Sequence, residues 1–431
     1  MKVSSRFVQC FLVLLLVFGA MISLAPAQAQ TLTFDLLHTF TGSPDGISPG
    51  GPIGTPAAGP LLDAKGNLFG TTSSGGDINC PGEGFGCGTV FKLDKNGQDS
   101  ILYTFLGGSD GDLPLASLSE DAAGNLYSTT VGPNGNAATV FKLTQSGQKT
   151  ILHTFSDGAD GAGPDTTPIL DAAGDLYGTT PYGGDSQCGI NGNACGVIYK
   201  VDAHGKFSVF HTFRTIAGGM RPEGGLGMDA AGTIYGSTAF GGIKCPESDE
   251  LGCGTVFKIE PSGKFRVLYR FTGKADGAGP INATADAAGN VYGITAAAGD
   301  FSCYAPSGCG TIFRIDTAGK FSVLFTFNSK NMKNPGFDFL VLDSKGNLYV
   351  TTLFGLPGTG GQLFELDTKG KFTTLFNFAD YGNNDGEGLN TNTITIGKNG
   401  DFYGTMKLLG DLNCGGQDFG CGTVFKLTPK Q

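Results

Sequence analysis

The chain has 431 residues, which is long for one compact domain unless it is built from repeats. Acidic residues outnumber basic ones by 38 to 28, and the formal net charge is −10, without any cluster of Lys or Arg. Nucleic acids and anionic membrane surfaces bind proteins through concentrated positive charge, so this composition excludes both as expected partners.

Residues 1–29 have the pattern of a secretory signal peptide. Lys2 and Arg6 give a positive start, Phe7–Leu24 is almost wholly apolar, and Ala27-Gln28-Ala29 fits the small-x-small cleavage rule. We therefore expect a secreted or periplasmic protein; an uncleaved membrane anchor is the alternative. No later stretch has the roughly 20 apolar residues that a spanning helix needs, so no membrane contact is expected after cleavage.

A six-residue phrase, NLYSTT in one copy, occurs seven times after this segment. Successive copies start 50 to 58 residues apart, close to the period of a propeller blade rather than a solenoid turn. The copies start at Asn67, Asn125, Asp175, Thr233, Asn290, Asn347 and Asp401. We predict seven repeats within one domain, residues 30–431.

Each repeat contains four short segments typical of strands. In the first repeat they are Pro60–Leu62, Asn67–Thr72, Thr89–Leu93 and Ile101–Phe105, all rich in β-branched and aromatic residues. D-x-x-G turns join the first segment to the second and the third to the fourth. The Asp bonds to nearby N–H groups and the Gly accepts the positive φ of a short hairpin. No window has a sustained helical period, so the chain is predicted to be all-β.

The fourth segment is out of step with the other three. The chain ends soon after its seventh third segment, at Thr423, and the missing fourth segment, Leu36–Phe40 (LLHTF), precedes the first repeat. Pairing this N-terminal strand with the last three strands would close a ring and leave no open sheet edge. The sequence therefore predicts a seven-bladed β-propeller of four-stranded antiparallel blades; a β-solenoid is the alternative.

Alternating strand direction sorts the loops onto two faces. The connections from second to third strand share a face with those between blades, and that face carries all the long loops. Ten cysteines fall in pairs in the second-to-third connections, and the two blades without cysteines lack both members. We predict five disulfides within blades, with zinc ligation as the alternative. The pairs are Cys80–Cys87, Cys188–Cys195, Cys245–Cys253, Cys303–Cys309 and Cys414–Cys421.

The dipeptide Asp-Gly recurs five times in the loops between blades. A ring of carboxylates at a channel mouth would suit calcium, but Asp-Gly is also an ordinary turn dipeptide, and the regular spacing of a calcium loop is missing. We favour the turn and predict no cofactor and no metal. The dipeptides begin at Asp45, Asp110, Asp160, Asp276 and Asp385.

Three of the four histidines, His38, His153 and His211, occupy one repeat position in the fourth strand. Other blades have Tyr or Phe there, so the interchange predicts packing against the next blade rather than catalysis. No H-E-x-x-H, G-x-S-x-G or phosphate-binding glycine loop occurs, and we predict no catalytic residue.

Several motifs resemble those of the GloVer (Gloeo–Verruco) repeat proteins, also called choice-of-anchor repeat proteins. They are LYGTT at Leu176, GGDSQCG at Gly183, GTVFKL at Gly88 and DGAGP at Asp160 and Asp276. The resemblance covers about residues 34–428 and implies an exported repeat protein. It implies no particular activity.

Two functions fit these features. The first is an extracellular or periplasmic binding or scaffold module, expected to be monomeric, whose long-loop face binds a glycan or a protein. The second is a propeller enzyme, a polysaccharide lyase or hydrolase, with its site at the channel mouth. The candidate ligand-binding residues are Asp110, Asp160, Asp276, Asp385, Tyr182, Phe240 and Tyr304.

Overall fold

The computed structural model describes most of the repeats. The described residues are 32–42, 47–49, 59–77, 79–80, 86–132, 137–188, 194–245, 251–303, 307–329, 337–352, 361–378, 394–406 and 421–430. The predicted signal peptide, Asp45, Tyr304, Asp385 and Cys414 lie outside them. Within the described ranges, no helix is long and apolar enough to cross a membrane.

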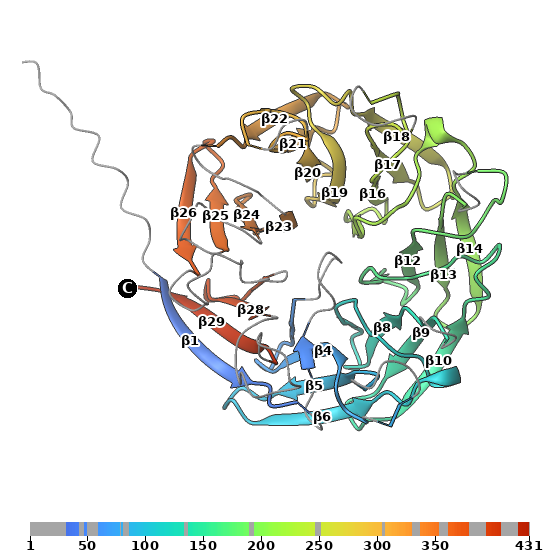
Figure 1. Ribbon diagram of the computed structural model, residues 1–431, viewed down its shortest axis with the longest axis vertical. Helices are drawn as coiled ribbons and strands as arrows, with labels where there is room; N and C mark the ends of the chain where they lie inside the picture. The colour runs from blue at the N-terminus through green and yellow to red at the C-terminus, as the bar shows by residue number, and fades with distance from the viewer. Residues whose placement is uncertain are drawn as a thin grey trace, which may run out of the picture.

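Seven antiparallel sheets are arranged around a central axis (Figure 1), which confirms the predicted propeller. The fourth strands lie at the periphery, and the two first strands that Figure 1 labels, β19 and β23, lie nearest the axis of their sheets. The first strands are β3 (Leu61–Leu62), β7 (Ser119–Glu120), β11 (Ile169–Leu170), β15 (Leu226–Met228), β19 (Ala278–Ala285), β23 (Phe337–Leu342) and β27 (Thr395–Ile396). The second strands are β4 (Leu68–Ser74), β8 (Leu126–Thr130), β12 (Leu176–Thr180), β16 (Ile234–Thr238), β20 (Val291–Ala297), β24 (Leu348–Thr352) and β28 (Phe402–Met406).

The outer half of each blade is equally regular. The third strands are β5 (Thr89–Leu93), β9 (Thr139–Leu143), β13 (Val197–Val201), β17 (Thr255–Ile259), β21 (Thr311–Ile315), β25 (Gln362–Leu366) and β29 (Thr423–Pro429). The fourth strands are β6 (Asp99–Thr104), β10 (Lys149–Thr154), β14 (Phe207–Thr212), β18 (Phe265–Arg270), β22 (Phe321–Thr326), β26 (Phe372–Asn377) and, in the last blade, β1 (Leu32–Thr39). Two 3₁₀ turns, η1 (Gly108–Asp110) and η2 (Ile216–Gly218), lie in loops between blades.

The ring closes through the N-terminal strand, as predicted. β1 pairs antiparallel with β29 from Leu32 opposite Pro429 to Thr39 opposite Thr423, and the last sheet has the order β1-β29-β28-β27. The first sheet differs from the prediction because it has a fifth strand, β2 (Ile47–Pro49). β4 continues to Ser74, beyond the predicted end at Thr72, and β2 pairs with that extension. An extended strand leaves unpaired backbone groups, which a short added strand satisfies.

Buried aromatic pairs join neighbouring blades. At six of the seven seams, the Phe that follows the fourth strand meets the central aromatic residue of the third strand in the next blade, edge to face, with ring centroids 5.1 to 5.5 Å apart. The pairs are Phe40–Phe91, Phe105–Phe141, Phe155–Tyr199, Phe213–Phe257, Phe271–Phe313 and Phe378–Phe425. Edge-to-face pairs contribute about 0.5 to 1.5 kcal/mol each beyond area burial, so these seams hold the ring.

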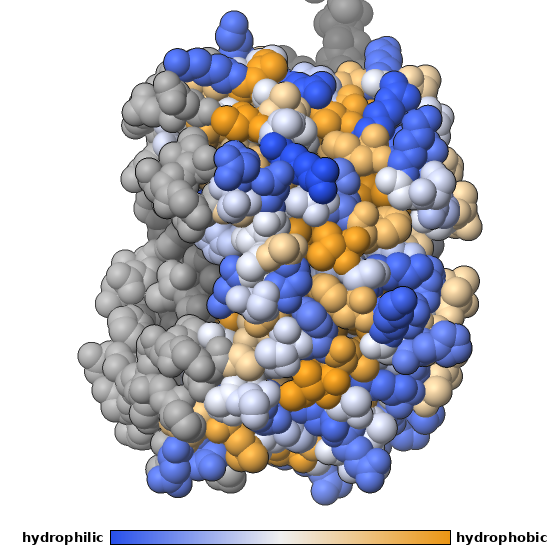
Figure 2. All heavy atoms as spheres, turned by 90° about the vertical axis from the view of Figure 1, so that its right-hand side faces the viewer, coloured by the Kyte–Doolittle hydropathy of each residue, from blue (hydrophilic) through white to orange (hydrophobic). Residues whose placement is uncertain are grey.

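A glycine in the second strand makes room for the central ring of the third. A Cβ atom on Gly70 would lie 2.4 Å from Cζ of Phe91, closer than side-chain atoms can approach. On the outer wall, seen around β14 in Figure 2, hydrophobic side chains lie in scattered patches among hydrophilic ones. Val209 of β14 is one such side chain, 37% exposed. The apolar core of the protein therefore lies between blades rather than on this wall.

Candidate functional site

The loops between blades and the loops from second to third strand lie on one face, which we call the loop face. Three inter-blade loops donate a backbone hydrogen bond to the carbonyl of the second cysteine of the preceding blade. Leu113 N donates to Cys87 O (3.2 Å), Arg221 N to Cys195 O (3.0 Å) and Gly279 N to Cys253 O (2.9 Å). The predicted sorting of the loops is therefore present, and the cysteine loops support the segments that lead into the first strands.

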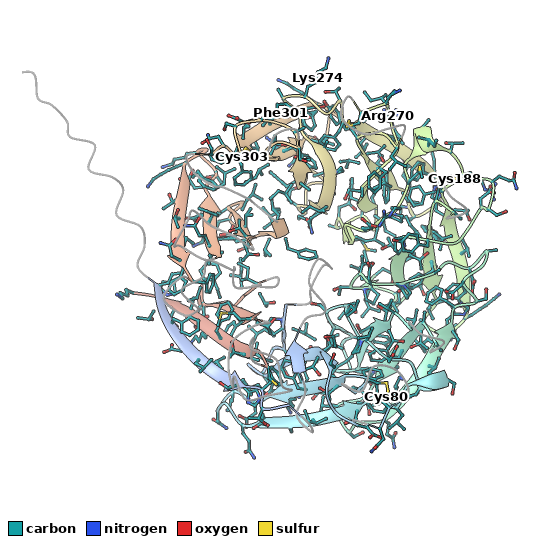
Figure 3. All side chains as sticks on the ribbon, in the orientation of Figure 1. Cys80, Cys188, Arg270, Lys274, Phe301 and Cys303 are labelled. Atoms are coloured by element: carbon teal, nitrogen blue, oxygen red, sulfur yellow. A yellow bond between two sulfur atoms is a disulfide. The ribbon has the colours of Figure 1, made fainter. Side chains whose placement is uncertain are left out.

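Four of the five predicted cysteine pairs form disulfides in the structure. Their members are 6 to 8 residues apart in sequence, each within one blade: Cys80–Cys87, Cys188–Cys195, Cys245–Cys253 and Cys303–Cys309. Cys80, Cys188 and Cys303 lie at well-separated places around the ring (Figure 3). Of the fifth pair, Cys421 is disulfide-bonded and Cys414 lies outside the described residues.

The three described Asp-Gly aspartates each bind the fourth strand of their own blade, and Asp110 also pairs with Lys149 Nζ of the next blade (2.9 Å). Asp276 accepts hydrogen bonds from Tyr269 Oη (3.0 Å), Thr272 N (2.8 Å) and Thr272 Oγ1 (2.5 Å). Asp110 accepts from Tyr103 Oη (2.7 Å), and Asp160 lies 2.9 Å from His153 Nε2. Each aspartate therefore fastens its loop to the peripheral strand, and the structure does not bring Asp110, Asp160 and Asp276 together.

Two of the three histidines at the repeated position stack flat on a phenylalanine of the next blade. The ring centroids of His153 and Phe207 are 3.4 Å apart, and those of His211 and Phe265 are 4.1 Å apart. Burial, with a smaller effect of Arg214, lowers the pKa of His211 to about 4, so this ring is neutral at physiological pH. A neutral stacked ring fills space between blades, as the interchange with Tyr and Phe predicts.

Tyr182 and Phe240, two predicted ligand-binding residues, are brought together by Arg221. The guanidinium carbon of Arg221 lies 5.1 Å from the centroid of Tyr182 and 5.2 Å from that of Phe240, within cation–π range of both. Arg221 Nη2 also donates to Tyr182 Oη (2.9 Å) and pairs with Glu223 Oε1 (2.6 Å). We call these four residues the arginine cluster.

Arg221 is held in an unfavourable backbone conformation. Its φ is 57°, while the same repeat position carries Gly163 (φ 65°), Gly279 (φ 59°) and Leu113 (φ 49°). The backbone is fixed by three hydrogen bonds, from Arg221 N to Cys195 O and from Ala239 N and Glu223 N to Arg221 O. Left-handed φ costs about 1 to 2 kcal/mol for a residue with a Cβ, so glycine would be the more stable choice here. Strain of this kind often marks a functional position.

An apolar groove of about 210 Å³ lies beside the arginine cluster. Its walls include Phe240, the Cys245–Cys253 bridge and Phe301, whose side chain is 43% exposed. Phe301 lies close to Cys303 in Figure 3. The groove thus joins the disulfide-closed loops of two neighbouring blades.

A second cavity, of about 270 Å³, lies on the axis of the ring. The walls come from the first-strand regions of five consecutive blades and include Ser117, Asp165, Leu226, Asn282 and Leu340. The carboxyl group of Asp165 is almost wholly enclosed, although the residue as a whole is partly exposed. Oδ1 of Asp165 and Oδ1 of Asn282 are buried, and no described residue hydrogen-bonds to them.

The surroundings of the axial cavity shift the pKa of the Asp165 carboxyl group. Burial, and then the charge of Glu223, raise the pKa of Asp165 to about 7, against smaller lowering effects of a hydrogen bond from its own backbone N–H and of the charge of Arg221. Burial also raises the pKa of Glu223, and Arg221 opposes that rise. Among the described residues, no three His, Cys, Asp or Glu side chains lie close enough together to hold a metal ion.

The sequence analysis missed Asp165, Arg221 and Glu223. Asp165 and Glu223 occupy one repeat position, directly after a proline, where the neighbouring blades have Leu115 and Ile281. Alignment of the repeats with one another shows charged residues at a position that is apolar in the flanking blades. That comparison would have identified both Asp165 and Glu223 from the sequence.

Comparisons with known proteins agree with the fold. The sequence profile of the Gloeobacter/Verrucomicrobia repeat matches residues 18–191 and 189–419. A comparison with curated proteins found no significant match. The extracellular domain of a one-component system from B. thetaiotaomicron is 12% identical with a TM-score of 0.52; the match covers 92% of this chain but only 39% of that one.

Two enzymes are also similar in structure. A gluconolactonase is 11% identical over 94% of this chain and 93% of its own, with a TM-score of 0.42. A puromycin hydrolase is 12% identical over 85% of this chain and 53% of its own, with a TM-score of 0.49. At such identities the likeness to the B. thetaiotaomicron domain concerns the fold alone, and the two enzymes carry no argument about activity.

Proposed function

Since the chain belongs to the Gloeobacter/Verrucomicrobia repeat family and folds as a seven-bladed propeller with disulfide-closed loops, we propose that it is an exported module that binds a glycan on its loop face. The observation that carries the proposal is the arginine cluster with the apolar groove beside it. The groove, about 210 Å³, suits one sugar ring, whereas protein partners bury broad and flatter patches.

The chemistry of the cluster supports a glycan. Phe240 and Phe301 give the groove aromatic walls for the apolar side of a sugar, and Arg221, which is not itself on the wall, brings N–H donors close to Phe240. Nε of Arg221 is buried without a hydrogen-bond partner among the described residues. The two neighbouring blades have glycine at this position, where a positive φ is not strained. A strained arginine in its place is expected of a residue that contacts a ligand rather than of a structural residue.

The test is the substitution Arg221→Gly, assayed on a glycan array with the purified protein. We expect the positive φ to be relieved, stability to be retained, and binding to the glycans recognised by the parent to fall at least about tenfold. Leu113→Gly is the matched control, because it relieves the same backbone strain at the same repeat position without removing a guanidinium. Equal binding by the parent and Arg221→Gly, or binding only to protein probes, would exclude this site.

The enzyme alternative has one supporting observation. Asp165, with its pKa raised to about 7, has the protonation behaviour of a general acid or base and lines a cavity. A screen for polysaccharide cleavage would test it, with Asp165→Asn as the inactive variant. Cleavage that persists in Asp165→Asn would place any such activity elsewhere.

A further inference from the structure

Asp165 is the only ionisable residue among the described residues that line the axial cavity. Its carboxyl group lies almost wholly inside the protein, and Oδ1 receives no hydrogen bond from the described residues. Leaving a buried carboxylate oxygen unpaired costs about 1 to 3 kcal/mol or more. The next blade has Glu223 at the same repeat position, and the blades that flank this pair avoid the cost with Leu115 and Ile281. The cavity therefore keeps a charged acceptor that the fold does not require.

The cavity contains a second unpaired acceptor, Oδ1 of Asn282, from the blade on the other side of Gly224 and Gly225. Two hydroxyl groups on the wall are already paired within the protein. Thr166 Oγ1 bonds to Thr179 Oγ1 (2.6 Å), and Ser117 Oγ donates to Gly59 O (2.7 Å). The two free atoms are thus both oxygens, so a complementary ligand must donate hydrogen bonds.

One of the two glycines on the wall, Gly225, leaves open space in the cavity, whereas Gly224 is packed closely against Ser237 and Ile281. A Cβ on Gly225 would meet nothing within 4 Å, whereas the same repeat position carries Ser117 in one blade and Ala283 in another. The remaining wall is apolar, including Ile169, Leu226 and Leu340. A compact carbon skeleton with one polar donor group fits such a space.

Charge decides which donor suits the site. The charged groups that reach Asp165 are Glu223 and Arg221, and these two form an ion pair of their own (2.6 Å). An ionised Asp165 therefore lacks a compensating positive charge. A hydroxyl group would donate one hydrogen bond and leave that charge, while an ammonium group brings three donors and a positive charge. Calcium takes six to eight oxygen ligands, and the described wall offers two unpaired ones.

We propose that the axial cavity binds a primary ammonium group carried on a compact carbon skeleton, with the ammonium donating to Oδ1 of Asp165 and Oδ1 of Asn282. This site shares no wall residue with the loop-face groove, so the proposal goes beyond the glycan-binding function and stands without it.

The test is isothermal titration calorimetry with cyclohexylamine and with cyclohexanol, its neutral isostere, at about pH 5 and about pH 8. Alkyl ammonium groups stay protonated at both pH values, as that of lysine does. We expect cyclohexylamine to bind at least about tenfold more tightly at pH 8, where Asp165 is ionised, and cyclohexanol to show no such change. Glucosamine and glucose, compared at about pH 7, distinguish an amino sugar from an alkyl amine as the source of the ammonium.

Three variants sharpen the result. Asp165→Asn should remove both the preference for the amine and its pH dependence, while Asn282→Ala should weaken amine binding several-fold and keep the pH dependence. Asp202→Asn changes the net charge equally but lies in an exposed D-x-x-G turn on the opposite face, so binding should not change. Folding of each variant is checked by thermal melting.

Equal affinity for amine and alcohol, or an amine affinity that is the same at both pH values, would overturn the proposal even if Asp165→Asn failed to fold. Displacement of the amine by calcium chloride alone would point to a metal site instead. Loss of glycan binding in the double substitution Cys245→Ser with Cys253→Ser, whose bridge lines the groove and not the axial cavity, with unchanged amine binding would separate the two sites.

Discussion

The two faces of the ring use aspartate in different ways. On the face opposite the loop face, which we call the turn face, one hydrogen-bonded arrangement recurs: Asp121 Oδ1 accepts from Ala123 N and Asn125 N, each at 2.9 Å. Asp63, Asp171, Asp229, Asp286 and Asp343 repeat it. On the loop face, by contrast, Asp165 replaces an apolar residue and keeps an oxygen without a described partner.

This difference separates structural from functional candidates. A carboxylate whose oxygens are all used by its own turn stabilises the fold and has little left for a ligand. By the same criterion Asp110, Asp160 and Asp276 belong with the turn-face aspartates, although they lie on the loop face. Departure from the repeat at an energetic cost, as at Asp165 and Arg221, is the better indicator of a binding site.

The two faces differ in this way only if the ring is closed, and removing β1 would open the ring. Phe34 of β1 stacks on Phe376 and Phe425, and Phe40 is buried against Phe91 of the first blade. Deleting Thr31–Phe40 from the mature protein should expose β29 as an edge and lower the free energy of unfolding by more than about 5 kcal/mol, comparable with the whole stability of many domains. Circular dichroism melts and size-exclusion chromatography measure this. A deleted protein that stays monomeric and melts like the parent would contradict closure; removal of Lys430 and Gln431 is the control.

The disulfides stiffen only the loop face, so removing one should affect that face alone. The double substitution Cys245→Ser with Cys253→Ser opens a loop whose ends are 8 residues apart. It should lower the free energy of unfolding by about 2.5 kcal/mol and weaken binding at the groove. Urea unfolding and the glycan array give the two readouts. The matched control, Cys80→Ser with Cys87→Ser, should lose similar stability and keep the binding, since that bridge lines no part of the groove.

The classification of the Asp-Gly aspartates as structural predicts a stability effect. Asp276→Ala leaves Tyr269 Oη and Thr272 N without their acceptor, which should cost about 2 kcal/mol in urea unfolding. Ligand binding measured below the unfolding range should be unchanged. If Asp276→Ala were as stable as the parent but no longer bound the ligand, Asp276 would have to be classified as a ligand-binding residue rather than a structural one.

The pH dependence of stability should differ between the faces. Burial raises the pKa of Asp63, but hydrogen bonds from Asn67 and Lys65 outweigh that effect and lower it. The stability from Asp63 and its equivalents Asp121 and Asp286, whose pKa values are also lowered, is therefore present above the ordinary value of 3.8 and is lost as pH falls below it.

Asp165 should act in the opposite sense. Its pKa is raised to about 7, so its contribution to stability is fully present below pH 3.8 and is lost as pH rises through about 7. Asp165→Asn should therefore be more stable than the parent at pH 8, by about 1 kcal/mol, and the gain should shrink at pH 5. Urea unfolding at both pH values measures the difference. A variant less stable than the parent at pH 8 would mean that the carboxylate is satisfied in the folded protein.

The sequence by itself determined the ring. The sequence contains seven copies of one phrase and four strand segments in each repeat. The fourth segment missing from the last repeat is LLHTF at Leu36–Phe40, and its pairing with the last repeat closes the propeller. The cysteine pairs and the two faces followed from the same periodicity. The extra strand β2 did not, because it depends on how far β4 extends, which the repeat pattern leaves open.

Only the tertiary structure decided which polar residues are left over for a ligand. Asp276 and Asp165 are similar in sequence context, each lying in an inter-blade loop near a Gly-Pro step, yet one is saturated by Tyr269 and Thr272 and the other faces a cavity. Hydrogen-bond partners and enclosure come from residues far apart in the chain. The meeting of Tyr182, Arg221 and Phe240 likewise depends on the packing of one blade against the next, which no local pattern contains.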